Sequence, residues 1–350
     1  MQLSIYSENN WDDYKTWYNN KASCLDIYYD PFYLELEECI IEGKRKVIVV
    51  EDGEDFLLYP FLEQFIPVPS FESYSDAISP YGYSGPYWSC TNNEFKLKSE
   101  QMVCDYQKEH KIVNELIRYH FYYNQHATFE LGIQNIYNRQ VVIINLQDTW
   151  DNLWANHFSA TNRNLIRKLE KEGYECFETS DLNFYTSFIE LYYQTMDNAR
   201  ALEYYYFSKK YFEKLKIELG RKVKLFVVVK EGVLYNAALF FITNNIITYH
   251  LSARNLLYPK VPGGNYLLAA VIKLFIGETW KYLNLGGGTN SDDNNHLLKF
   301  KQNFSKQTMN FFIGKRIFSP ELYQHLKEAY KTFHGADSLD LKQNIVQFYR

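Results

Sequence analysis

The chain has 350 residues, of which 46% are hydrophobic and 23% are charged, and its formal net charge is −5. These values describe a globular protein of one large or two ordinary domains and exclude a chain that is disordered as a whole. Basic residues are spread along the sequence, which excludes a DNA-wrapping arm and limits any RNA contact to a local one. The five cysteines stand at irregular spacings without a CxxC or Cys/His cluster, so we expect no metal site and a reducing compartment.

The first twenty residues, MQLSIYSENNWDDYKTWYNN, contain neither a basic n-region nor an apolar h-region. The longest apolar runs, such as LYNAALFFI, are too short to span a bilayer. The sequence therefore predicts a cytoplasmic chain without an integral membrane segment.

The first half of the chain shows helix, hairpin, loop, helix and strand in that order. Helical patterns over Trp11–Asn19 and Asp30–Leu36 precede a hairpin pattern over Lys46–Ile66, which turns at Gly53. The elements that follow are the Pro/Gly-rich loop Ser79–Trp88, an amphipathic helix over Gln101–Gln125 and a strand over Ala127–Gly132.

The second half repeats this order. Helical patterns over Phe184–Met196 and Ser208–Leu219 precede a hairpin pattern over Lys224–Ala253, which turns at Gly232. The elements that follow are the loop Leu257–Gly264, an amphipathic helix over Asn265–Thr279 and a strand over Tyr282–Leu285. The shared order indicates a weak internal repeat.

A basic helix connects the halves. Thr161 or Asn162 is suited to cap its first turn, and Gly173 is suited to end it before a strand over Tyr174–Phe177. Arg163 and Arg167 are four residues apart and fall on one face of this helix, where two guanidinium groups suit a diphosphate. A solvated helix with salt-bridging glutamates is the plainer reading of the same charges.

The stretch Leu285–Lys301, LGGGTNSDDNNHLLKFK, is the foremost candidate for chemistry. Three glycines after a strand let the backbone approach a ligand and adopt positive φ, and strand ends line ligand crevices in open α/β sheets. In the short helix that follows, lysine alternates with apolar residues, which anchors Phe300 and directs Lys299, Lys301 or both outward. A flexible surface loop is the alternative reading.

Two further segments offer side chains to a ligand. The loop Ser79–Trp88 presents Tyr81 and Tyr83 either as a binding rim or as parts of a buried turn. The segment KVPGG, which ends in Gly263 and Gly264, precedes a helix, where free amide groups suit phosphate.

A helix is also expected over Val113–Asn124, and it would place Glu115, Arg118 and Tyr122 on one face. That arrangement could position His120 or bind a ligand, although a surface ion pair explains it as well.

Four stretches in this order resemble the FemAB-like branch of the GNAT superfamily, which includes FemX-type peptidoglycan bridge aminoacyltransferases and related envelope acyltransferases. They are SPYGYSGP (Ser79–Pro86), ELIRYHFYYN (Glu115–Asn124), RNLIRKLEKEG (Arg163–Gly173) and the region Gly263–Phe304 with its LNLGGG and KFKQNF motifs. The sequence departs from the family in having Phe121 after the histidine and a degenerate pyrophosphate loop.

The resemblance implies an α/β (α+β) fold of two tandem GNAT-like domains, each a mixed, mostly antiparallel sheet flanked by helices, with a cleft between them. The expected ranges are 1–148 and 149–317, with 318–350 able to pack back on the first domain. Among the candidate site residues, Lys301 is implied to lie near the acyl donor, and the basic helix is implied to contact acceptor phosphates. The catalytic candidates are Lys301, Lys299 and His120, with Asp76 and Glu115 as further candidates for a general base; the substrate-binding candidates are Tyr81, Tyr83, Arg118, Arg163, Arg167 and Tyr249; the donor-binding candidates are Gly263, Gly264, Gly286, Gly287, Gly288 and Phe300.

Three functions remain open on this basis. The first is transfer of an acyl or aminoacyl group to an amine of a nucleotide-linked cell-envelope precursor, with aminoacyl-tRNA or an acyl thioester as co-substrate and no tightly bound cofactor. The second is acyl-CoA-dependent acylation of an amino sugar or small amine. The third is a ligand-binding module that has kept the fold and lost the chemistry.

Overall fold

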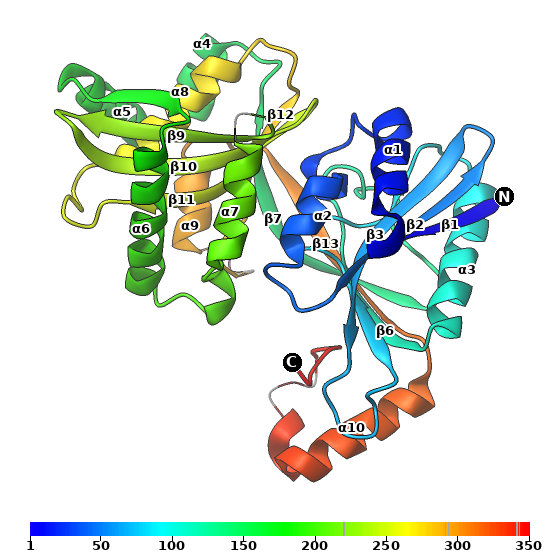
Figure 1. Cartoon of the computed structure of the whole chain (residues 1–350). Helices are drawn as coiled ribbons and strands as arrows, with labels where there is room; N and C mark the ends of the chain where they lie inside the picture. Colours follow the sequence, from blue (N-terminus) through cyan, green and yellow to red (C-terminus); the bar gives the residue numbers. More distant parts are fainter. Residues whose placement is uncertain (220, 291, 293, 341, 343) are drawn as a thin grey trace. The chain divides into compact units, whose positions relative to one another are not determined.

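The computed structural model describes residues 1–219, 221–290, 292, 294–340, 342 and 344–350 (Figure 1). The chain forms two compact units. Unit 1 comprises Met1–Ser23, Tyr28–Asn138 and Asn310–Arg350, and unit 2 comprises Cys24–Ile27 and Arg139–Met309. The ranges predicted for two domains from the sequence stay a prediction.

Unit 1 is a mixed sheet with helices. Its helices are α1 (Trp11–Lys21), α2 (Pro31–Glu37), α3 (Asn93–Glu109) and α10 (Pro320–His334). Its strands are β1 (Gln2–Tyr6), β2 (Lys44–Asp52), β3 (Asp55–Phe65), β4 (Ser75–Ile78), β5 (Tyr87–Trp88), β6 (Ile112–Arg118) and most of β13 (Thr308–Ile317). The strand order is β1-β2-β3-β4-β6-β13, with β5 beside β3; β4 and β6 are parallel, and the other neighbours are antiparallel.

Unit 2 is also a mixed sheet with helices. Its helices are α4 (Trp150–Asn152), the π-helical turn Leu153–His157, α5 (Ala160–Lys171), α6 (Leu182–Ala199), α7 (Lys209–Glu218), α8 (Gly263–Phe275) and α9 (His296–Gln302). Its strands are part of β7 (Ile133–Asn145), β8 (Glu175–Thr179), β9 (Val223–Lys230), β10 (Val233–Ile242), β11 (Ile246–Arg254) and β12 (Tyr282–Gly286). The strand order is β7-β12-β11-β10-β9-β8; β11 and β12 are parallel, and the other neighbours are antiparallel.

The two sheets share one pattern of pairing. Read from β13 in unit 1 and from β7 in unit 2, each sheet has an antiparallel pair, then a parallel pair, then three antiparallel pairs. In both units a helix connects the two parallel strands, α3 in unit 1 and α8 in unit 2, as a parallel connection requires. The structure therefore confirms the α/β fold class and supports an internal repeat.

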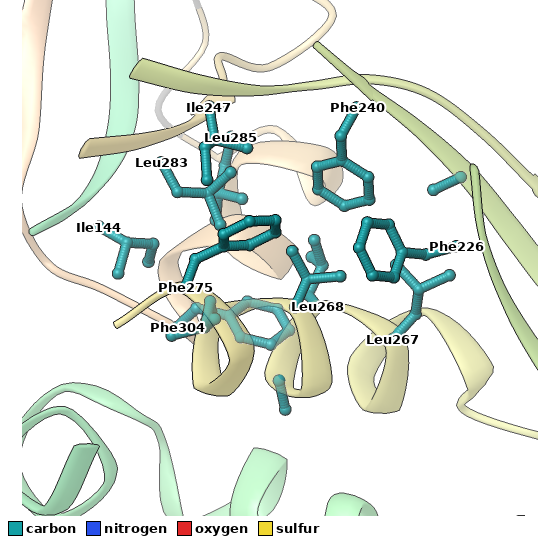
Figure 2. Close-up of a cluster of buried hydrophobic side chains, with 14 of the residues drawn as sticks. Ile144, Phe226, Phe240, Ile247, Leu267, Leu268, Phe275, Leu283, Leu285 and Phe304 are labelled. Atoms are coloured by element: carbon teal, nitrogen blue, oxygen red, sulfur yellow. The ribbon is translucent and has the colours of Figure 1, made fainter. Parts of the chain in front are cut away.

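The core of unit 2 lies between α8 and one face of the sheet (Figure 2). Leu267, Leu268 and Phe275 of α8 pack against apolar side chains of the strands, and all three are buried. The strand side chains in this core come from alternate residues, for example Leu283 and Leu285 of β12, because successive residues of a strand point to opposite faces. On β11 and β12 the residues between the core positions therefore face the other side, where α6 packs on β10 and β11.

The expected helix over Val113–Asn124 is wrong. Residues Ile112–Arg118 form β6, which pairs with β4 and β13, and the chain then turns. In a strand, residues three apart point to opposite faces, so Glu115 is buried while Arg118 is half-buried. Arg316 of β13 neutralises Glu115 by an ion pair of 3.3 Å between Nε and Oε1, a partner about 200 positions away that no local pattern could indicate.

Of the other elements predicted from the sequence, the hairpins are present, whereas one strand and one helix cap differ. The hairpins are confirmed, with positive φ at Gly53 and Gly232, which their turns require. The strand expected over Ala127–Gly132 is wrong, since the next strand begins at Ile133. The cap of the basic helix α5 is Ser159, whose Oγ accepts a hydrogen bond from the Asn162 amide at 3.2 Å; neither Thr161 nor Asn162 is the cap. Among the described residues, no helix is long and apolar enough to cross a membrane.

Candidate functional site

The candidate site of unit 2 is built on the end of β12 and on α9. Gly286 ends β12 with φ at 76°, which a glycine adopts readily. A Cβ on Gly287 would lie 2.7 Å from the Gln140 carbonyl oxygen and 2.9 Å from Arg139 Cδ, so a side chain does not fit there. The glycine run thus lets the loop lie against β7.

The helix α9 orients the two candidate lysines differently. The side chain of Asn295 caps α9, and Oδ1 accepts hydrogen bonds from the Leu297 and Leu298 amides at 3.0 and 3.2 Å. Leu298 and Lys301 are three residues apart on one face, and both are buried. Lys299 is exposed, and its Nζ donates to Asn294 Oδ1 at 3.0 Å.

Lys301 is only 7% exposed, and its Nζ donates to the Gly287 carbonyl oxygen at 2.7 Å. Burial, together with the nearby positive charge of Arg139, lowers the pKa of Lys301 to about 7. A lysine with this pKa can both hold and release a proton at neutral pH, which an ordinary surface lysine cannot do.

Arg139 was not singled out from the sequence. Its Nη1 donates to the Gly288 carbonyl oxygen at 2.8 Å, so it binds the same loop as Lys301. The two residues are far apart along the chain, and a single arginine within β7 gives no sequence pattern by which it could have been found.

The donor-binding candidates Gly263 and Gly264 lie at the first turn of α8. A Cβ on Gly264 would be 3.7 Å from Phe300 Cζ, so the first turn of α8 and the helix α9 lie side by side in unit 2. A Cβ on Gly263 would be 2.9 Å from Asn236 Cβ, so close packing against β10 also explains why a glycine stands at this position. Tyr249 lies on β11, half-buried against the core, and burial raises its pKa to about 12.

The two arginines of α5 have different surroundings. Arg163 donates from Nη1 to the carbonyl oxygens of Trp154, Ala155 and Phe158 at 3.0, 3.2 and 2.6 Å, and so holds the end of the π-helical turn. Arg167 is exposed, and its guanidinium lies 5.3 Å from the centre of the Trp154 ring. Phosphate binding by either residue stays a prediction.

The candidates of unit 1 surround the loop Ser79–Trp88. Arg118 donates from Nη1 to the Ser79 carbonyl oxygen at 2.7 Å, and the Tyr81 amide donates to Glu37 Oε2 at 2.5 Å. The ring of Tyr83 packs edge-on against Phe121 and Phe311, each at 5.0 Å between ring centres. These contacts hold the loop in place, and the predicted binding roles of the three candidates stay predictions.

His120 is buried, and its Nδ1 accepts hydrogen bonds from the Tyr122 and Tyr123 amides at 3.1 and 3.2 Å. The imidazole thereby closes a turn after β6, and its catalytic role stays a prediction. Glu37, which the sequence did not single out, is buried beneath the same loop, and burial raises its pKa to about 7.

No protein-family model matches the chain, and no curated protein matches it. Solved structures do match it. FemX aligns with a TM-score of 0.66 at 14% identity, covering 93% of this chain and 99% of FemX. The C-terminal domain of a putative lysylphosphatidylglycerol synthetase from Agrobacterium fabrum aligns with a TM-score of 0.56 at 11% identity, covering 94% of this chain and 97% of that domain.

L-PGS from Bacillus licheniformis is similar as well, with a TM-score of 0.54 at 13% identity, covering 90% of this chain and 95% of that one. All three identities lie far below the level at which sequence likeness would carry an activity from one protein to another. The chain thus has the fold of FemX, which is the fold that the sequence resemblance predicted.

Proposed function

We propose that the chain is an acyltransferase that moves an aminoacyl or acyl group from an activated donor to an amine of a nucleotide-linked cell-envelope precursor. The observation that carries the proposal is the buried Lys301, which lies against a glycine loop with a second cation, Arg139, bound to the same loop. The fold adds support, because lysylphosphatidylglycerol synthetase is by its name an enzyme whose product carries a lysyl group.

The reaction requires an amine nitrogen to attack the donor carbonyl carbon, after which the bond from that carbon to the leaving oxygen or sulfur breaks. Negative charge develops first on the carbonyl oxygen and then on the leaving atom. In its protonated form Lys301 stabilises this charge and passes a proton to the leaving atom, and solvent returns to it the proton that the amine releases. A pKa of about 7 suits this role, because the proton is held before the step and given up during it.

The donor is an aminoacyl ester on tRNA or an acyl thioester of CoA under this proposal. Both carry phosphate groups, and the free amides at the start of α8 would suit either. Because Gly264 lies beside the Phe300 ring of α9, these amides are close to the helix that bears Lys301. The second candidate function, acyl-CoA-dependent acylation of an amino sugar or small amine, is favoured by the same observation.

Transfer assays with two donors test the proposal. The full chain is incubated with an amine-bearing UDP-linked peptidyl sugar or with an amino-sugar nucleotide, and either charged tRNA or acetyl-CoA is added. Mass spectrometry identifies the acylated product, and a thiol reagent measures CoA release. We expect acylation with one donor class; consumption of neither donor, together with calorimetric binding of an acceptor, would support a non-catalytic binding module instead.

A further inference from the structure

Two buried polar side chains lie beside each other in the parallel pair of unit 2. Thr248 of β11 and Asn284 of β12 are register partners, and they are 4% and 1% exposed. Their preceding residues, Ile247 and Leu283, point into the core with α8. Thr248 and Asn284 therefore point to the opposite face of the sheet, the side on which α6 packs.

The orientation of the Asn284 amide follows from its hydrogen bond. Oδ1 accepts from the Gly286 amide at 2.8 Å, so the NH2 group points away from that loop. Among the described residues, neither Asn284 Nδ2 nor Thr248 Oγ1 has a hydrogen-bond partner. A buried polar group without a partner costs roughly 1–3 kcal/mol, so two neighbouring ones indicate a group that the protein alone does not supply.

Neighbouring polar groups on this face are already engaged. His250, two residues beyond Thr248 on β11, shares a hydrogen bond between Nε2 and the Tyr211 hydroxyl of α7. Asn284 in turn is joined through Gly286 to the loop that Lys301 binds. Asn284 thus lies on β12, the strand that leads into the candidate site, and Thr248 lies on the neighbouring strand β11. Because both side chains are almost fully buried, only a small group could reach them.

The hydrogen-bonding capacities of Thr248 and Asn284 indicate which ligand atom they can bind. The Asn284 NH2 only donates, and the Thr248 hydroxyl both donates and accepts. A neutral oxygen can accept a hydrogen bond from both, whereas an ammonium group could donate only to the Thr248 hydroxyl and would leave the Asn284 NH2 group without an acceptor. We propose that Thr248 and Asn284 recognise a neutral oxygen, either a hydroxyl or an amide carbonyl, on the acyl group that the enzyme transfers.

This inference rests on the proposed acyl transfer, and it is tested with donors that differ by one polar group. Six donors are prepared on one carrier, which is an acceptor-stem RNA or, if thioesters are the donors, CoA. They form three pairs that differ in a polar group: serine and alanine, threonine and valine, and asparagine and leucine. We expect the oxygen-bearing member of at least one pair to react with the higher kcat/KM. Thr248→Val should reduce that preference by about tenfold, because one hydrogen bond to the oxygen is lost.

Variants separate recognition from folding. Thr248→Ser keeps the hydroxyl and should retain the preference, and Thr186→Val on the exposed face of α6 should leave it unchanged. Thermal unfolding of Thr248→Val should show equal or higher stability, since an unpaired hydroxyl is removed. A preference that Thr248→Val does not change, or no preference in any pair, would show that the pair holds only water and would overturn the inference. If the wild type transfers none of the six groups but transfers an acetyl group from acetyl-CoA, the inference alone fails. If it transfers no group from any donor, the proposed function fails, and this inference with it.

Discussion

Arg139 and Lys301 bind the carbonyl groups of two consecutive glycines, Gly288 and Gly287, at 2.8 and 2.7 Å. Two cations are thereby kept close to one glycine loop, and one of them is buried. Like charges in proximity disfavour protonation of the weaker base, which is the lysine. The loop geometry and the proton affinity of Lys301 are therefore parts of one arrangement.

Stability should depend on pH through Lys301. Its pKa is about 7 in the folded chain against 10.5 for an ordinary lysine, so the unfolded chain binds the extra proton between these values. The free energy of unfolding should then rise with pH across this interval by up to about 1.4 kcal/mol per pH unit. In Lys301→Met this contribution is absent. Urea unfolding of both proteins from pH 7 to 10 measures the difference, and parallel curves would contradict the lowered pKa.

Removal of the neighbouring cation should raise the proton affinity of Lys301. Arg139→Gln should shift the alkaline limb of the pH profile of kcat/KM for acyl transfer to higher pH, because Lys301, the proton donor, then stays protonated up to a higher pH. Arg139→Lys, which keeps the charge, should leave the limb near its original place. A limb that does not move in Arg139→Gln would show that Arg139 supports the loop without acting on Lys301.

The two arginines of α5 should respond differently to replacement. Arg163→Met removes the donor for three backbone carbonyl groups and should lower the free energy of unfolding by about 1–3 kcal/mol. Arg167→Met loses only a contact with the Trp154 ring, with an expected cost of about 0.5–1 kcal/mol. If α5 binds the acceptor's phosphates, Arg167→Met should raise KM for the acceptor and leave kcat unchanged. An unchanged KM would assign this helix a purely structural role.

Local signals predicted much of the fold. Glycine at the hairpin turns and helical periodicity placed β2 with β3, β9 with β10, and the helices α6 to α9, because those features act within a few residues. β6 was mistaken for a helix because it is buried on both faces and so lacks alternation, and its charge is compensated by the distant Arg316.

The candidate site was predictable only in part. The glycine run and the lysine motif directed attention to Leu285–Lys301, of which Ser291 and Asp293 lie outside the described residues. Which lysine is buried depends on the face that α9 presents to the core, and the sequence alone left that open. Arg139, Thr248 and Asn284 have meaning only through partners that folding brings to them from other strands and loops.

The most direct test compares the two lysines of α9 in acyl transfer. Lys301→Met and Lys299→Met remove the same charge two residues apart, one buried beside the glycine loop and one exposed. Single-turnover rates with the donor that the wild type accepts should fall by a factor of about 100 or more in Lys301→Met, in line with general acid catalysis, and stay near wild type in Lys299→Met. Equal rates in the two folded variants would contradict the assignment of the chemistry to Lys301.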